Sequence, residues 1–126
     1  MSASILVVED EPLVARITCR FLEEVGFTCA IAGSAGAALQ LIDNGAVPDL
    51  IVLDIRLPDL PGPELALRIH SRYPRIPILF VSGWVAGLAD PDRLAQLYWD
   101  FLPKPFKGER LGDAVRRMLD GAHSRS

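Results

Sequence analysis

This sequence gives little evidence of disulfides, of membrane-spanning segments or of a secretory signal. Its 126 residues include two cysteines, Cys19 and Cys29, which form neither a CxxC pair nor a metal-ligand spacing. Because both lie in apolar segments, we expect buried, reduced thiols. No apolar run approaches the roughly 20 residues that cross a bilayer, and no basic segment followed by an apolar one opens the chain. We therefore expect a cytoplasmic protein without membrane insertion.

Basic residues are also in short supply. Thirteen Lys and Arg stand against 16 Asp and Glu, a net charge of -3 that argues against direct nucleic-acid binding. Half of the residues are hydrophobic and 23% are charged, which is a globular composition. The length suits one domain, so we expect a single domain over residues 1–126, with a core at about 4–120 and a tail at 121–126.

Short apolar runs alternate with helical spacings along the whole chain. Such continuous runs are typical of strands buried on both faces of a parallel sheet. Right-handed crossovers between them predict a doubly wound α/β fold with helices on both faces, in which ligands bind at the carboxyl ends of the strands. We expect strands over 4–8, 27–31, 50–53, 77–81 and 101–102, and helices over 12–25, 34–45, around Leu65 and Ile69, over 90–97 and over 111–119.

Three carboxylates stand at the ends of predicted strands. Glu9 and Asp10 come directly after the first strand, and Asp54 follows the run of the third. Carboxylates that crowd together repel one another unless a cation neutralises them. Oxygen ligands without His or Cys favour Mg²⁺, with Mn²⁺ as the other choice. A simpler reading, in which Glu9 and Asp10 only begin the next helix, leaves Asp54 unexplained.

Ser82 and Lys104 follow two further predicted strands. Only two of the 13 basic residues are lysines, Lys104 and Lys107. A compact ammonium contacts one anionic group as a point charge, which a guanidinium does not imitate well. Lys104 is therefore a candidate for binding an anion beside the carboxylates. The alternative for Lys104 is an ordinary surface lysine between two prolines. The alternative for Ser82 is a residue that only forms a turn.

These residues occur in a characteristic order. The chain contains VVEDE, LDIRLPDLPG, FVSG and KPF in succession, with 44 residues from Asp10 to Asp54, 28 to Ser82 and 22 to Lys104. Over residues 5–120 the chain thereby resembles the receiver domains of two-component response regulators, of the chemotaxis-regulator type. The stretches PILFVSGW and LPKPF resemble the receivers of hybrid sensor kinases. The resemblance implies a flavodoxin-like sheet of five parallel strands in the order 2-1-3-4-5.

The resemblance also implies a phosphorelay. Asp54 would accept a phosphoryl group from a histidine kinase or a histidine phosphotransfer protein, with its carboxylate as nucleophile and an acyl phosphate as product. Mg²⁺ would be held by Glu9, Asp10, Asp54 and the backbone carbonyl of Arg56. Such a chain is a signalling switch that assists its own phosphorylation and dephosphorylation, and not an enzyme.

Three further residues take roles by resemblance. Lys104 and the cation would offset charge on the phosphoryl oxygens. Ser82 would hydrogen-bond the phosphoryl group, and Phe101 would rotate in behind it. The changed surface would be that of the fourth helix, fifth strand and fifth helix, where a downstream protein or a second copy of the chain would bind. Four of the nine aromatic residues lie between residues 84 and 101, either in the core or on this surface.

Some residues depart from the family pattern. Arg56 and Trp84 lie two residues beyond Asp54 and Ser82, where a stacked pair would cover the approach of water to the acyl phosphate. If Arg56 pairs instead with Glu9 or Asp59, the site stays open. Leu97-Tyr98-Trp99 replaces a glycine turn that is typical before the fifth strand.

The sequence leaves other functions open. A small Mg²⁺-dependent phosphatase with an aspartate nucleophile expects Asp-x-Asp after the first strand, where this chain has Glu9-Asp10-Glu11. A receiver-like binding module would not bind Mg²⁺. A nucleotide-binding protein fits poorly because no glycine-rich loop follows the first strand. The chain is either a stand-alone receiver or one that belongs to a larger protein.

Overall fold

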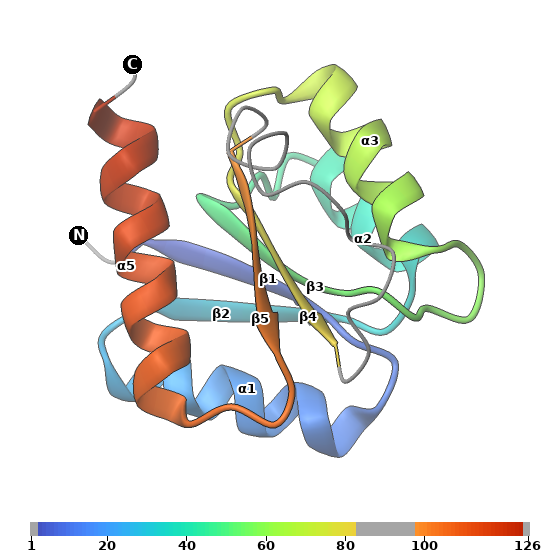
Figure 1. The fold of residues 1–126 in the computed structure, drawn as a ribbon. Helices are drawn as coiled ribbons and strands as arrows, with labels where there is room; N and C mark the ends of the chain where they lie inside the picture. The colour runs from blue at the N-terminus through green and yellow to red at the C-terminus, as the bar shows by residue number, and fades with distance from the viewer. Residues whose placement is uncertain (1–2, 83–97, 125–126) are drawn as a thin grey trace.

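The computed structural model describes residues 3–82 and 98–124. Five strands form one sheet in the order β2-β1-β3-β4-β5 (Figure 1). Every pair of neighbouring strands is parallel, so the expected parallel sheet and its 2-1-3-4-5 order are confirmed. The strands are Ser4–Val8 (β1), Thr28–Ala32 (β2), Leu50–Asp54 (β3), Ile78–Ser82 (β4) and Trp99–Pro103 (β5).

Helices cover both faces of the sheet. Two of them, α1 and α5, lie on one face, and α2 and α3 lie on the other (Figure 1). This arrangement confirms the doubly wound α/β fold. The helix expected over 90–97 lies outside the described residues. The described helices are Pro12–Glu24 (α1), Ala35–Asp43 (α2), Gly62–Arg72 (α3) and Gly108–Ser124 (α5).

The two faces of the sheet carry separate hydrophobic cores. In β1, Ile5 and Val7 pack with α1 and α5, whereas Leu6 and Val8 pack with α2 and α3. Successive side chains of a strand point to opposite faces, and here both faces are covered. The strands therefore read as unbroken apolar runs instead of an alternating pattern.

Helix ends follow local capping rules. Ser34 accepts a hydrogen bond from the backbone N–H of Ala37 at 3.1 Å and caps α2 as expected. Gly26 and Gly45 follow α1 and α2 with φ of +100° and +97°. These left-handed conformations favour glycine and stop each helix near the expected residue.

Several boundaries differ from the sequence expectations. β2 and β4 each begin and end one residue later than expected. α5 continues through Gly121 to Ser124, so the tail expected from residue 121 is wrong. A glycine inside a helix costs only about 1 kcal/mol relative to alanine, which the rest of a long helix can offset.

Trp99 makes β5 longer than the two residues expected. Its side chain is 8% exposed and its ring packs edge-on against Phe80 and His70, with centroids 5.3 and 6.0 Å away. Of the two alternatives for the aromatic residues, Trp99 therefore belongs to the core. Tyr98, directly before β5, has φ of +59°. The turn before β5 thus keeps a glycine-like conformation without a glycine.

Both cysteines are free thiols, as expected. Cys19 on α1 is buried, but Cys29 on β2 is only half-buried, because β2 is an edge strand of the sheet. Burial raises the pKa of each thiol, and a contact between the two thiols raises the pKa of Cys29 further. Both thiols are therefore held in the protonated form.

Within residues 3–82 and 98–124, no helix is both long enough and apolar enough to cross a membrane.

Candidate functional site

The carboxyl ends of the central strands bring the expected site residues to one edge of the sheet. In the strand register Val8 pairs with Leu53, so Glu9 follows β1 at the level where Asp54 ends β3. Asp54 pairs with Val81, so Ser82 lies one residue further along β4. The backbone N–H of Lys104 donates to the carbonyl of Ser82 at 2.8 Å. Four chain segments therefore meet at this edge.

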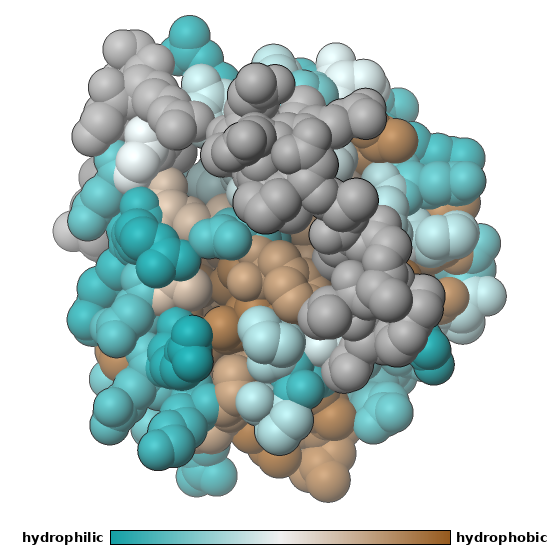
Figure 2. All heavy atoms as spheres, viewed as in Figure 1, coloured by the Kyte–Doolittle hydropathy of each residue, from teal (hydrophilic) through white to brown (hydrophobic). Residues whose placement is uncertain are grey.

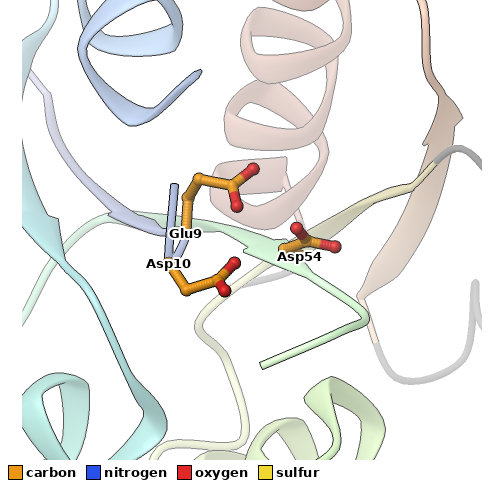
Figure 3. A group of neighbouring side chains, drawn as sticks. All are labelled: Glu9, Asp10 and Asp54. Atoms are coloured by element: carbon orange, nitrogen blue, oxygen red, sulfur yellow. The ribbon is translucent and has the colours of Figure 1, made fainter. Parts of the chain in front are cut away.

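Three carboxylates form the centre of the site. Figure 3 shows the carboxyl groups of Glu9 and Asp10 turned to the same side, towards Asp54. One oxygen from each lies within 4.8 Å of the others. Glu9 and Asp54 are 4% and 8% exposed, whereas Asp10 is open to solvent. This set of hard oxygen donors, open on one side, fits a divalent cation that keeps some of its waters.

Lys104 supplies positive charge beside the carboxylates. Its Nζ lies 2.7 Å from Oε1 of Glu9 and 3.6 Å from Oδ2 of Asp54. Burial favours the neutral amine, but the hydrogen bond to Glu9 and the charge of Asp54 outweigh it, so the pKa of Lys104 is raised. Lys104 therefore stays charged, and it is no ordinary surface lysine.

Glu9 is strongly perturbed by its surroundings. Burial raises the pKa of Glu9 to about 7; the hydrogen bond from Lys104 opposes this rise and Asp54 adds to it. In addition, Oε2 of Glu9 accepts a hydrogen bond from the backbone N–H of Glu11 at 3.3 Å. A cation at this site would replace the proton that Glu9 holds near neutral pH.

The loop after β3 is fitted closely around Asp54. The backbone N–H of Arg56 donates to Oδ1 of Asp54 at 3.1 Å. Gly62, the first residue of α3, lies so close that a Cβ there would be 2.4 Å from the Asp54 carbonyl oxygen. Trp84 lies outside the described residues, so the stacked pair of Arg56 and Trp84 stays a prediction.

Ser82 and Phe101 lie on the same face of the sheet. Phe101 pairs with Phe80 across the β4–β5 ladder, and Ser82 is two residues after Phe80. Ser82 is buried, whereas Phe101 is half-buried and packs against the core under α2 and α3. The two side chains thus lie on one face of the sheet, in neighbouring strands and two residues apart in the register.

The loop after β3 also contacts α2 through a residue for which no such contact was expected from the sequence. Asp59 accepts hydrogen bonds from the backbone N–H groups of Ala35 and Gly36, at 3.0 and 2.9 Å. The sequence indicated Asp59 only as an alternative partner of Arg56, because contacts between residues more than 20 positions apart leave no local pattern.

Comparison with known proteins agrees with this geometry. The family model of the response regulator receiver domain matches residues 5–116. Sensor kinase CckA of Brucella abortus is 34% identical over 120 residues, which are 94% of this chain and 13% of that protein. Response regulator MprA of Mycobacterium ulcerans is 37% identical over 126 residues, covering 94% of this chain and 51% of that protein. The chain thus spans 13% of the length of CckA and about half of the length of MprA.

Solved structures share the whole fold. A CheY-like receiver domain protein from Methanospirillum hungatei is 26% identical, with a TM-score of 0.86 and 100% of both chains covered. The receiver domain of the hybrid histidine kinase CckA is 28% identical, with a TM-score of 0.76 over 92% of this chain and 98% of that chain. With the sheet order, the acidic edge and the matched residues 5–116, these likenesses show that the chain belongs to the family of response regulator receiver domains.

Proposed function

We propose that this chain is the phosphorylated switch of a two-component pathway and that Asp54 is its phosphoryl acceptor. The observation that carries the proposal is the position of Asp54, which ends the central strand β3 between two other carboxylates and the ammonium of Lys104. A carboxylate oxygen of Asp54 would attack the phosphorus of a phosphohistidine. The phosphorus–nitrogen bond breaks, the electron pair returns to the histidine nitrogen, and an acyl phosphate forms.

Glu9, Asp10 and Asp54 are the proposed ligands of Mg²⁺, with Mn²⁺ as a substitute and the backbone carbonyl of Arg56 as a further ligand. The grouping of three carboxylate oxygens supports this assignment. The bound cation supplies charge neutralisation for the transferred phosphoryl group. Lys104 supplies a second positive charge, because its ammonium already reaches towards Asp54.

Ser82 and Phe101 are the proposed switch. After transfer, the Ser82 hydroxyl donates to a phosphoryl oxygen, and Phe101 moves inwards from its half-buried position on the same face of the sheet. This movement alters the surface made by β5, α5 and the helix expected over 90–97. A downstream protein or a second copy of the chain binds there. Such a switch works by biasing two arrangements of one element.

The proposed phosphoryl donor is a histidine kinase or a histidine phosphotransfer protein. One similar protein is named a hybrid histidine kinase, CckA, and another is Sensor protein TorS of Escherichia coli, 30% identical over 115 residues. We assign residues 1–126 to one receiver domain that acts in the cytoplasm, with proteins and not nucleic acids as its partners.

The test is phosphorylation by acetyl phosphate, followed by intact-protein mass spectrometry. We expect one added phosphoryl group in the wild type with Mg²⁺, and none after EDTA or in Asp54→Asn. Asp113→Asn on the exposed face of α5 is the control and should be phosphorylated normally. Labelling of Asp54→Asn at the wild-type level would contradict the assignment of Asp54. A wild type that is never labelled and does not bind Mg²⁺ would indicate a receiver-like binding module.

A further inference from the structure

The loop between β3 and α3 is anchored at its base by two hydrogen bonds of ordinary length. At its end, the backbone N–H of Gly62 donates to the carbonyl of Ile55 at 2.8 Å. At its start, the N–H of Arg56 donates to the carboxylate of Asp54 at 3.1 Å. The missing side chain of Gly62 lets α3 rest on the Asp54 backbone. Both ends of the loop are therefore fixed next to the phosphorylation site.

Asp59 anchors the same loop at its tip, on a different helix. Its Oδ1 accepts from the N–H of Ala35 at 3.0 Å, and its Oδ2 accepts from the N–H of Gly36 at 2.9 Å. These donors belong to the first turn of α2, where backbone N–H groups lack a partner inside the helix. Ser34 accepts from the next one, that of Ala37. Asp59 and Ser34 together thus complete the N-terminus of α2.

The charge of Asp59 suits this position. The N-terminal end of a helix carries partial positive charge, which favours a carboxylate. The hydrogen bonds from Gly36 and then Ala35 hold the pKa of Asp59 below its usual range, so Asp59 is ionised near neutral pH. Two charge-assisted bonds of good length form a stronger tether than neutral ones.

We propose that Asp59 is a positioning residue for cation binding, because it fixes the loop that presents the backbone carbonyl of Arg56. The inference rests on the proposed function, in which that carbonyl is a metal ligand. Arg56 forms the first tether through its own N–H, and it lies three residues before the second tether at Asp59. A loop fixed at Arg56 and again at Asp59 offers the Arg56 carbonyl already in place. Without the tether at Asp59, cation binding must order the loop, which costs conformational entropy.

The test is Mg²⁺ affinity, measured by isothermal titration calorimetry on the full chain with Asp59→Ala. We expect the dissociation constant to rise about fivefold, the cost of ordering roughly one residue. At saturating Mg²⁺, labelling by acetyl phosphate should proceed at about the wild-type rate, because Asp59 touches no reacting atom. Asp59→Asn keeps one acceptor oxygen and should show a smaller rise. Faster amide exchange at Ala35 and Gly36 in Asp59→Ala would verify that the tether is lost.

Ser34→Ala is the matched control. It removes a cap from the same helix end without touching the loop after β3. A positioning role for Asp59 predicts that Ser34→Ala lowers the melting temperature and leaves Mg²⁺ affinity unchanged. If both variants weaken Mg²⁺ binding equally, the effect comes from α2 itself and the inference is wrong.

Two outcomes separate this inference from the proposed function. If the wild type binds Mg²⁺ and is phosphorylated but Asp59→Ala binds Mg²⁺ as tightly as the wild type, only the role of Asp59 is overturned. If the wild type binds no Mg²⁺, the proposed metal site and the role of Asp59 both fail.

Discussion

Among the carboxyl groups of residues 3–82 and 98–124, Glu9 is the one whose pKa folding raises to about 7. Its ordinary pKa near 4.5 rises to about 7, chiefly because the folded chain buries it; the Lys104 hydrogen bond limits the rise and Asp54 increases it. A group with a raised pKa binds its proton more tightly in the folded state. Its contribution to stability is therefore complete below about pH 4.5 and is lost as the pH rises through about 7.

We expect this loss to appear in the Mg²⁺-free protein. Urea unfolding with EDTA, at intervals between pH 4 and pH 8, should show that the free energy of unfolding falls with rising pH in the wild type. Glu9→Gln has no group to ionise there, so its stability should exceed that of the wild type increasingly as the pH rises. Taking the difference between the two proteins cancels the titration of the carboxylates that do not contact Glu9.

Parallel pH curves for wild type and Glu9→Gln would contradict the raised pKa. Mg²⁺ gives an independent reading, because it binds the ionised form of Glu9 and therefore displaces the proton of the neutral form. The affinity for Mg²⁺ should accordingly increase from pH 6 to pH 8 in the wild type and change less in Glu9→Gln.

At the scale of single elements, the junction of β3 and α3 depends on Gly62. A Cβ at this residue would lie 2.4 Å from the carbonyl oxygen of Asp54 and 2.9 Å from the Cα of Ile55. We expect Gly62→Ala to lower the free energy of unfolding by about 1–3 kcal/mol, as overpacking usually does. It should also slow labelling by acetyl phosphate, because α3 would push on the backbone of Asp54.

Gly121→Ala is the comparison for Gly62→Ala. Gly121 lies inside α5, and a Cβ there would meet nothing within 4 Å. This variant should gain up to about 1 kcal/mol from helix propensity and leave labelling unchanged. Equal stability of Gly62→Ala and wild type in urea unfolding would show that the β3–α3 junction can relax.

The elements best predicted from the sequence are those that local patterns define. β1 and β3 are continuous apolar runs that end in acidic residues, and α2 begins at a serine cap. β5 was predicted poorly because Trp99 gains its strand position from the core, through Phe80 and His70. Propensity gives no sign of such long-range packing.

The site residues show the same difference between local patterns and long-range contacts. Glu9, Asp54 and Lys104 were predictable because parallel strands end at one edge, so residues at strand ends must gather there. The contact of Asp59 with α2 could not be predicted from the sequence. It joins residues 23 and 24 positions apart, and its donors are backbone N–H groups, which do not depend on the residue type. Neither the pairing of Glu9 with Lys104 nor its effect on the Glu9 pKa could be foreseen without the register.

At the scale of the whole molecule, one feature is an exposed apolar surface on α1, the helix that follows Glu9 and Asp10. Leu13 and Ile17 on α1 are 66% and 45% exposed, although the other face of α1 packs in the core. Ile17 also lines a hollow between α1 and the segment after β5, together with Phe21 and Phe106. In Figure 2 hydrophobic atoms also gather at the lower edge, where Figure 1 places α1. Under the proposed function, a protein that brings phosphohistidine to Asp54 would contact this surface.

We therefore expect Leu13→Ala to slow phosphorylation by a histidine kinase about fivefold, the usual minimum for a residue important in an interface. Phosphorylation by acetyl phosphate, which needs no protein contact, should be unchanged. This prediction rests on the proposed function and is tested by comparing the two donors in parallel.

Leu67→Ala provides the control for Leu13→Ala. Leu67 is a 53% exposed leucine on α3, on the other face of the sheet. Its replacement should affect neither donor. If Leu13→Ala and Leu67→Ala behave alike with the kinase, α1 is not where the donor binds.

The low reactivity of the two native thiols makes the molecule convenient for labelling at an introduced cysteine. Maleimides and similar reagents react with the thiolate, and burial keeps Cys19 and Cys29 protonated by raising the pKa of both. Asp113→Cys would place a solvent-accessible thiol on the exposed face of α5, which would react much faster than the native thiols. Brief labelling at neutral pH can therefore attach a fluorophore or spin label at one chosen position while the native cysteines stay in place.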